Sequence, residues 1–247
     1  MDESGNRHLQ LAIFGDSHYA CVRQAHREGL ADIDGVDLEY WGHIGRRFNF
    51  LDLQNGAIVP TDDFTAARFA KFNEKGRRFL PAADFDMILF IGTRIYLTAI
   101  FISLLTVGRA GTFISSGLKR RMVHDELSSQ LGYRLAQGLA KTGTARIVVA
   151  PTAFWTKGYL PVEAAIPPEV RAATAQDRAE IWEIAVQAAA ADGITLIPQP
   201  EETVVDGVFS RPAYAIDNHQ DKGDFEHRNA AYGALILNRA LALLRTG

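Results

Sequence analysis

Short apolar runs alternate with longer stretches of helical spacing, and this alternation constrains the fold more than any other feature of the sequence. The runs are rich in β-branched residues and nearly continuous, which is typical of strands covered on both faces. The predicted strands are residues 9–14, 36–41, 86–91, 146–150 and 194–197. The predicted helices are residues 19–30, 118–141, 168–191 and 226–244. This order predicts an α/β fold with a central parallel sheet of about five strands and helices on both sides.

The 247-residue chain has no repeat, low-complexity stretch or linker that divides it, so we expect one domain over residues 1–247. Two dipeptides, Asn55-Gly56 and Asp206-Gly207, suit tight turns with positive φ and predict two hairpins beside the sheet. Segment 92–116 is strongly apolar. Two interpretations stay open for it: a buried helix, or a mobile lid or oligomer contact above the site, because loops at the carboxyl ends of parallel strands form the ligand crevice.

Charge and cysteine content exclude several classes of protein. The net charge is −3 with no long run of one sign, so the basic surface of a nucleic-acid binder is missing. A single cysteine, Cys21, excludes an intrachain disulfide, and we interpret it as a small buried residue. The first eight residues lack the features of a secretory signal, and the apolar stretch 95–107 is shorter than the ~20 residues of a spanning helix. We expect a cytoplasmic protein without a transmembrane segment.

The first predicted strand runs directly into Gly15, Asp16, Ser17 and His18. A serine at this point lies at the carboxyl edge of the sheet, where Gly15 permits a tight turn and the following helix amides can stabilise an anion. A serine hydroxyl is a weak nucleophile that needs a neighbouring base. The competing interpretation is that Asp16 and Ser17 only cap the helix, because both residue types are good N-caps.

A candidate base lies near the other end of the chain, where Asp224 precedes His227 by three residues at the predicted entry to the last helix. This offset can bring both side chains to one side of a helix. Histidine is the natural base at neutral pH, and a carboxylate beside it fixes the useful tautomer. The competing interpretation is that Asp224 is an N-cap, and the two roles are compatible.

The same region also contains Asp217, His219 and Asp221. These side chains, with Asp224 and His227, are of the types that bind metals, but no second cluster with regular ligand spacing supports a metal site. We therefore expect no metal and no cofactor, and we place His219 in a loop or at the edge of a substrate site.

Residues 13–18 resemble the first block of the SGNH/GDSL hydrolase superfamily in its Gly-Asp-Ser-His variant, and Asp224 and His227 resemble the Asp-x-x-His pair of these hydrolases. Asn229 and Tyr232-Gly233 are similar to the His-x-Asn-x-x-Tyr-Gly of bacterial members. The resemblance implies a flavodoxin-like three-layer α/β/α sandwich. It also implies that Ser17 is the nucleophile of a triad with Asp224 and His227, and that the Ser17 amide contributes to an oxyanion hole.

In that family the other oxyanion donors are a glycine amide after the second strand and an asparagine in a Gly-x-Asn-Asp block after the third. We assign the glycine to Gly45, with Gly42 as the second choice. After the third strand the chain reads Gly92, Thr93, Arg94, so an arginine stands where the family has asparagine. A guanidinium at this position either supports the oxyanion, binds an acidic group of the substrate, or leaves the hole one donor short.

We expect the substrate to contact Asp16, His18, Gly92 and Asn229, which lie beside these catalytic positions in sequence. Three functions stay open. The first is a serine esterase for a small or carbohydrate O-acyl ester, with an acetylated sugar preferred because the Gly-Asp-Ser-His form resembles bacterial members linked to surface polysaccharides. The second is an O-acyltransferase with the same serine chemistry, and the third a binding module that kept the fold. A homo-oligomer through segment 95–107 is a further expectation.

Overall fold

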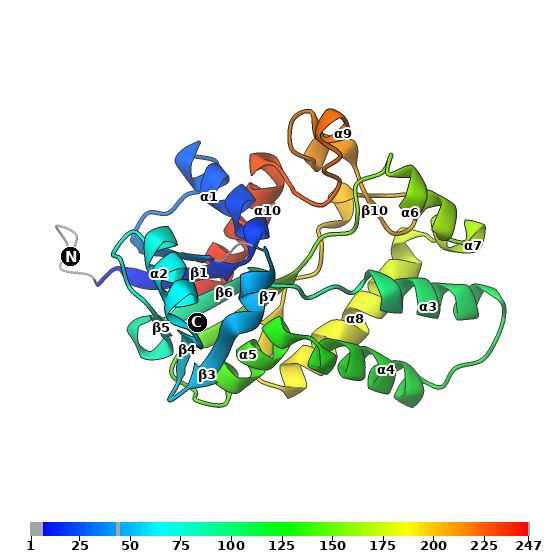
Figure 1. Ribbon diagram of the computed structural model, residues 1–247. Coiled ribbons are helices and arrows are strands. Elements are labelled where there is room, and N and C mark those ends of the chain that lie inside the picture. The colour runs from blue at the N-terminus through cyan, green and yellow to red at the C-terminus, as the bar shows by residue number, and fades with distance from the viewer. Residues whose placement is uncertain (1–6, 43–44, 247) are drawn as a thin grey trace.

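One five-stranded parallel sheet forms the centre of the structure, a computed structural model that describes residues 7–42 and 45–246 (Figure 1). In sheet order the strands are β2 (Val36–Gly42), β1 (Leu9–Gly15), β6 (Met87–Gly92), β7 (Arg146–Pro151) and β8 (Ile194–Leu196). All neighbouring pairs are parallel. The predicted α/β sheet of five strands is therefore confirmed, with each strand within two residues of its expected bounds.

Helices cover both faces of the sheet, as the strand pattern requires. Alternate residues of a strand point to opposite faces. On β1, Leu11 and Ile13 pack in one apolar layer with residues of α1 (Ala20–Arg27) and α10 (Ala230–Arg245). Ala12 and Phe14 pack in the other layer with residues of α5 (Leu131–Ala140) and α8 (Ala175–Ala191). All four side chains are completely buried. The result is the three-layer, flavodoxin-like sandwich that the sequence predicted.

The helices begin where short polar side chains satisfy their first amides. Asp62 caps α2, Ser115 caps α4 and Asn229 caps α10, and Thr174 forms a capping box at the start of α8. The helices are α1 (Ala20–Arg27), α2 (Asp63–Phe72), α3 (Thr98–Arg109), α4 (Ser116–Ser129), α5 (Leu131–Ala140), α6 (Leu160–Ala165), α7 (Pro168–Arg171), α8 (Ala175–Ala191), α9 (His219–Lys222) and α10 (Ala230–Arg245).

The helix predicted over residues 118–141 is wrong, because the chain forms two helices, α4 and α5. The break is at Gln130, whose backbone is extended (φ −96°, ψ 133°). Its side chain accepts a hydrogen bond from the Tyr96 amide at 2.5 Å and donates one to the Tyr96 carbonyl at 3.0 Å. These two bonds to the loop after β6 offset the loss of helical continuity. Periodicity does not reveal them, since the apolar spacing continues through the break.

The two hairpins form at the predicted dipeptides. Asn55-Gly56 joins β3 (Leu51–Gln54) to β4 (Ala57–Pro60), and β5 (Leu80–Pro81) extends this small antiparallel sheet. Asp206-Gly207 joins β9 (Val204–Val205) to β10 (Phe209–Ser210). Both turns contain residues with positive φ, which these residue types tolerate.

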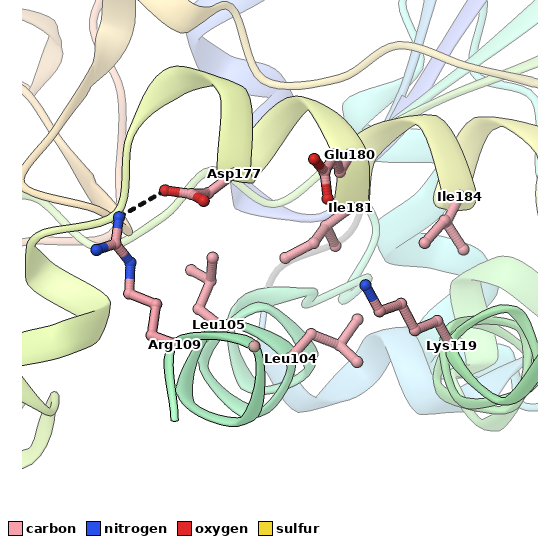
Figure 2. A pocket seen from close by; sticks show the side chains of 9 residues that line it. Leu104, Leu105, Arg109, Lys119, Asp177, Glu180, Ile181 and Ile184 are labelled. Atoms are coloured by element: carbon pink, nitrogen blue, oxygen red, sulfur yellow. Dashed lines mark hydrogen bonds and ion pairs between the residues drawn. The ribbon is translucent and has the colours of Figure 1, made fainter. Parts of the chain in front are cut away.

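The apolar segment after β6 contains α3, which buries its inner face. Phe101 contacts Phe154 and Trp182 with ring centroids 5.1 and 4.8 Å apart. A cavity of about 240 Å³ lies between α3, α4 and α8. Figure 2 shows its lining side chains, among which Arg109 donates a hydrogen bond of 2.6 Å to Asp177. The predicted helix is present at Thr98–Arg109 with one face buried, and residues 110–113 after it are exposed. A mobile lid and an oligomer contact through 95–107 stay predictions.

Two further expectations concern Cys21 and the membrane. Cys21 is buried, donates a hydrogen bond to the His18 carbonyl, and has a pKa that burial raises to about 12, which confirms its structural interpretation. Among the helices of the described residues, none has the length and apolar character needed to cross a membrane.

Candidate active site

The candidate nucleophile lies at the carboxyl edge of the sheet, directly after β1. Ser17 is the first residue of a 3₁₀ turn (Ser17–Tyr19) that leads into α1. Strand β1 lies between β2 and β6, so the chain reverses its direction of winding beside Ser17, at the place where ligands bind in open α/β sheets. Asp16 caps the turn by accepting a hydrogen bond from the His18 amide. Capping therefore falls to Asp16 and leaves the Ser17 hydroxyl available.

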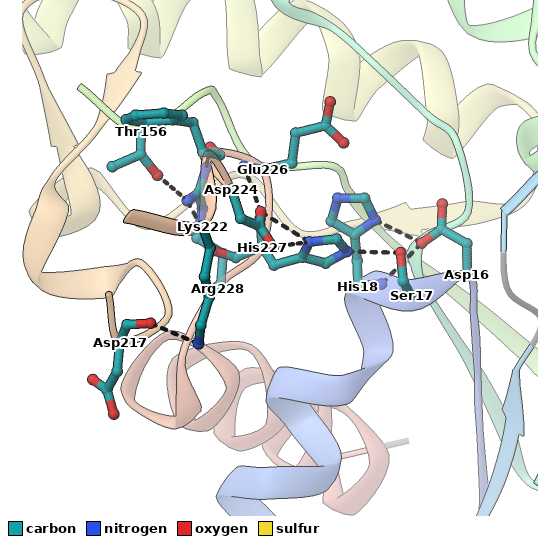
Figure 3. A network of polar contacts seen from close by, with 11 residues as sticks. Asp16, Ser17, His18, Thr156, Asp217, Lys222, Asp224, Glu226, His227 and Arg228 are labelled. Atoms are coloured by element: carbon teal, nitrogen blue, oxygen red, sulfur yellow. Dashed lines mark hydrogen bonds and ion pairs between the residues drawn. The ribbon is translucent and has the colours of Figure 1, made fainter. Parts of the chain in front are cut away.

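The fold brings Ser17, His227 and Asp224 together although Ser17 lies 207 and 210 positions before its two partners in the sequence (Figure 3). Ser17 Oγ lies 2.8 Å from His227 Nε2. His227 Nδ1 lies 2.8 Å from Asp224 Oδ2 and 3.0 Å from Asp224 Oδ1. This is the order of contacts that serine nucleophiles require, with a base on the hydroxyl and a carboxylate on the base.

A turn, and not a helix, positions His227. Asp224 Oδ1 accepts the backbone amides of Glu226 at 3.2 Å and His227 at 3.0 Å. Helix α10 begins only at Ala230, so the prediction of a helix from residue 226 is wrong. The Asp224 carboxylate thus organises the turn and contacts the imidazole with the same atoms, as short acidic side chains do in such turns.

The charge state of Asp224 follows from these contacts. Burial raises the pKa of Asp224, but hydrogen bonds from the His227 backbone and ring and the charge of His227 outweigh it, so the pKa lies below its ordinary value. The ionised carboxylate only accepts hydrogen bonds. His227 Nδ1 therefore carries the ring proton and donates a hydrogen bond to Asp224, and Nε2 accepts the hydrogen bond from Ser17.

Arg228, the residue after His227, fastens this turn to the loop after β7. Its guanidinium donates hydrogen bonds to Thr156 Oγ1 and to the carbonyls of Phe154, Phe225 and His227. The side chain is buried, and burial lowers its pKa to about 10. Sequence reasoning missed this residue, because an arginine beside a histidine gives no sign that it is buried.

A second carboxylate–histidine pair lies beside the first. His18 Nδ1 is 2.7 Å from Asp16 Oδ1, and the two residues are only 8% and 4% exposed. The His18 ring stacks on the His227 ring with centroids 5.1 Å apart and planes 28° apart. Burial raises the pKa of Asp16, but the hydrogen bonds and charge of His18 and the charge of Arg94 outweigh it and hold that pKa below its ordinary value.

Three consecutive residues at the end of β6 and directly after it have left-handed backbones: Gly92 (φ 68°), Thr93 (φ 49°) and Arg94 (φ 57°). At Gly92 a Cβ atom would lie 2.7 Å from His18 Cβ and 2.8 Å from Asp16 Oδ1, so only glycine fits there. Gly92 therefore makes a close approach to both residues. Left-handed β-branched and long side chains are uncommon and concentrate at functional sites.

The two glycines considered for the oxyanion hole have different surroundings. Gly42 ends β2, and a Cβ atom there would lie 2.2 Å from Tyr19 Cε1, so packing against Tyr19 accounts for this glycine. Gly45 is exposed with φ 61°, and no atom lies within 4 Å of its Cβ direction, so packing does not account for this glycine. Its role, like that of Arg94, stays a prediction.

Asn229 and His219 both serve the local structure. Asn229 Oδ1 accepts the Tyr232 amide at 3.2 Å, and Nδ2 donates to the Ala213 carbonyl at 2.8 Å. These bonds cap α10 and occupy both functional groups, and a substrate contact of Asn229 stays a prediction. His219 begins α9 and packs edge-to-face on Phe225, which places it next to the turn of residues 224–227.

A cavity of about 290 Å³ lies against the triad. Its walls come from the start of α1, the loop before α9 and the triad turn. The lining residues are Ser17, His18, Ala20, Cys21, Gln24, Ile216, Asp224, His227 and Arg228. This volume is at the lower end for small-molecule sites and suits a small group beside the nucleophile. In the described part of the chain, no three or more His, Cys, Asp or Glu side chains are grouped closely enough to hold a metal ion.

Comparisons with known proteins add only a distant structural likeness. No protein-family model matches the chain, and no curated protein matches it. Among solved structures, an extracellular lipase from Streptomyces rimosus is similar over 96% of this chain and 99% of its own, with 10% identity and a TM-score of 0.42.

Proposed function

We propose that this protein is a serine ester hydrolase in which Ser17 is the nucleophile, His227 the general base and Asp224 the carboxylate that orients it. The observation that carries the proposal is the chain of contacts from Ser17 Oγ to His227 Nε2 (2.8 Å) and from His227 Nδ1 to Asp224 (2.8 Å) at the carboxyl edge of the sheet. A hydroxyl activated in this way attacks carbonyl carbon.

The reaction has two halves. In the first, His227 takes the Ser17 proton, Ser17 Oγ attacks the ester carbonyl, and the protonated imidazole then gives this proton to the leaving alcohol. In the second, His227 takes a proton from water, the resulting hydroxide attacks the acyl-enzyme, and the proton returns to Ser17 as the acid leaves. The Asp224 carboxylate stabilises the imidazolium in both halves.

The negative charge on the carbonyl oxygen needs donors near Ser17. We assign them to the amides of Ser17 and Gly45 and to the Arg94 side chain. The first amides of a helical turn have no partner within the turn, which supports the assignment of Ser17. One such donor contributes about 3 kcal/mol to the transition state. Arg94→Asn tests the third donor: an unchanged or higher rate would show that the guanidinium is not needed.

We propose a small acyl group, with an O-acetyl sugar ester as the preferred substrate. The cavity of about 290 Å³ beside Ser17 supports a small acyl group. The sugar follows from the resemblance of the Gly-Asp-Ser-His block to bacterial polysaccharide enzymes. Acetate release measured with and without sugar acceptors separates hydrolysis from acyl transfer, because an acceptor that takes the acyl group lowers the acetate yield.

The experiment that tests the proposed function is intact-mass analysis after treatment with a fluorophosphonate probe. We expect one adduct on the parent protein and one on the control Ser103→Ala. The Ser103 hydroxyl that this control removes donates a hydrogen bond to the Ala99 carbonyl in α3. We expect none on Ser17→Ala. Absence of an adduct on the folded parent would contradict an activated serine and favour a binding module.

A further inference from the structure

The Asp16–His18 pair takes no part in the reaction described above, although it is the most buried ionisable pair at the site. His18 donates its backbone amide to Asp16 Oδ1 at 3.1 Å, and its ring nitrogen Nδ1 lies 2.7 Å from the same oxygen. Because the pKa of Asp16 is lowered, its carboxylate is an acceptor and His18 Nδ1 is the donor. This carboxylate therefore fixes both the tautomer and the orientation of the His18 ring.

The fixed ring lies against the catalytic base. The centroid of the His18 ring is 5.1 Å from that of the His227 ring, and the two ring planes are inclined by 28°. In Figure 3 the two imidazoles lie together beside Ser17, with Asp16 on the side away from Asp224. Gly92 approaches His18 so closely that a Cβ atom on Gly92 would lie 2.7 Å from His18 Cβ. This contact and the two hydrogen bonds to Asp16 restrict the position of the His18 side chain.

His18 is not itself a base for Ser17. The nitrogen within hydrogen-bond distance of Ser17 Oγ belongs to His227, and His18 Nε2 is buried without a hydrogen-bond partner among the described residues. A buried ring nitrogen left in this state is unfavourable, because it has lost its hydrogen bonds to water without gaining others. His18 nonetheless provides an aromatic ring that is held in place by the Asp16 carboxylate and stacks on His227.

We propose that Asp16 and His18 are positioning residues for the catalytic histidine: the anchored His18 ring holds His227 with Nε2 on Ser17, and Asp16 supplies a second negative charge to the imidazolium. This inference rests on the proposed function. When His227 takes the proton of Ser17, its positive charge lies between the Asp224 carboxylate on its edge and, across the His18 ring, the Asp16 carboxylate. Two ionised carboxylates then favour the proton transfer that starts the reaction.

Two variants separate the effect of the His18 ring from that of the Asp16 charge. His18→Asn keeps a donor at the position of Nδ1, so Asp16 stays paired, but removes the ring. We expect kcat to fall about 10- to 100-fold with KM within about twofold, because small misplacements of a base act on the chemical step. Asp16→Asn keeps an acceptor for His18 and removes only the charge. We expect kcat to fall about tenfold, as for the loss of a partly desolvated charge near the reacting group.

His26→Asn is the matched control. His26 lies in α1, its Nδ1 is 2.9 Å from Tyr40 Oη, and its ring stacks on Tyr40 with centroids 6.0 Å apart. The control therefore loses an equivalent ring, stack and hydrogen bond away from the triad. We expect its kcat and KM to equal those of the parent. Thermal unfolding of all variants verifies that each one is folded at the assay temperature.

Proton NMR gives a readout that does not depend on turnover. The Nδ1 proton between His227 and Asp224 should give a downfield signal, and a second such signal should come from His18 and Asp16. In His18→Asn we expect the second signal to vanish and the first to broaden, because an unsupported His227 ring exchanges its proton faster with water. In His26→Asn both signals should be unchanged.

Parental kcat in both His18→Asn and Asp16→Asn, or an equal loss in His26→Asn, would overturn the inference. So would a sharp, unshifted His227 signal in folded His18→Asn, even in a protein that hydrolyses no ester. Failure of the proposed function gives a different result. Ser17 of the parent would then not react with the fluorophosphonate, while the NMR comparison would still show whether His18 holds the His227 ring.

Discussion

Replacement of Asp224 by asparagine should disable the base without disturbing the turn that carries it. Asp224 Oδ1 accepts two backbone amides, at 3.2 and 3.0 Å, and the asparagine oxygen can take over both bonds. The new NH₂ group then occupies the position of Oδ2, 2.8 Å from His227 Nδ1. An amide N–H that faces Nδ1 requires a lone pair there, so the imidazole proton moves to Nε2. The nitrogen that faces Ser17 then cannot accept its proton.

The expected loss is large and confined to the chemical step. The same exchange in the triad of a serine protease lowers kcat by about 10⁴. The Asp224 side chain is 26% exposed, so water can partly replace the lost contact, and we expect kcat to fall by about 10³ to 10⁴. This equals about 4 to 5.5 kcal/mol of transition-state stabilisation. KM should stay within about threefold, because no substrate contact is removed.

Hydrolysis of an acetyl ester and the rate of fluorophosphonate labelling both measure this loss. Asp217→Asn is the control. Asp217 is exposed, and its backbone carbonyl, which the substitution leaves in place, accepts a hydrogen bond from Lys222. The double variant Asp224→Asn, His227→Ala should lose little more than His227→Ala alone, because the two residues act as one unit. Parental activity in Asp224→Asn, or an equal loss in Asp217→Asn, would refute the assigned triad.

Three further predictions concern stability. The folded-state pKa of Asp16 is below its ordinary value of about 3.9, so the stabilisation from its carboxylate is complete above that value and is lost as the pH falls through the folded-state pKa. In urea titrations at pH 7, 4 and 3, the unfolding free energy should therefore fall less with acid for Asp16→Asn than for the parent. Phe14→Ala removes a completely buried ring whose centroid lies 5.0 Å from that of Phe90. It should lower the unfolding free energy by about 3–5 kcal/mol in denaturant titrations, and a loss below about 1 kcal/mol would contradict the packing. Gly92→Ala places a Cβ atom 2.7 Å from His18 Cβ at φ 68°, so it should lower the melting temperature and kcat together, and parental values of both would show that this turn is not rigid.

The sequence predicts the sheet well because the strand pattern is local. The strands β6 and β7 are short apolar runs that contain Ile or Val, and nearly all of their residues are buried, so composition and burial agree there. Helix bounds are less predictable where a tertiary contact decides them. Gln130 ends α4 to bind the Tyr96 backbone, and Asn229 delays α10 until residue 230. Neither contact has a trace in the helical periodicity.

The candidate site is predictable where a motif is contained in a few neighbouring residues. Ser17 after a buried strand, and Asp224 three residues before His227, are visible in the sequence, and the structure places the three in contact. The support of the site is not visible in this way. The buried Arg228 clamp bonds Phe154 and Thr156, which lie more than seventy residues away, and only the folded chain brings these groups together.

The two carboxylate–histidine pairs show why local sequence does not decide which histidine serves the serine. Both are built alike: Asp16 accepts the amide and Nδ1 of the histidine two residues on, and Asp224 accepts those of the histidine three residues on. His18 is the neighbour of Ser17 in the chain, but successive side chains of a 3₁₀ turn point about 120° apart, so its ring is directed away from the hydroxyl. His227 reaches Ser17 because the turn before α10 ends over the start of α1. A serine at the tip of a strand therefore needs its base from a distant segment, and the adjacent histidine is free to hold that base in place.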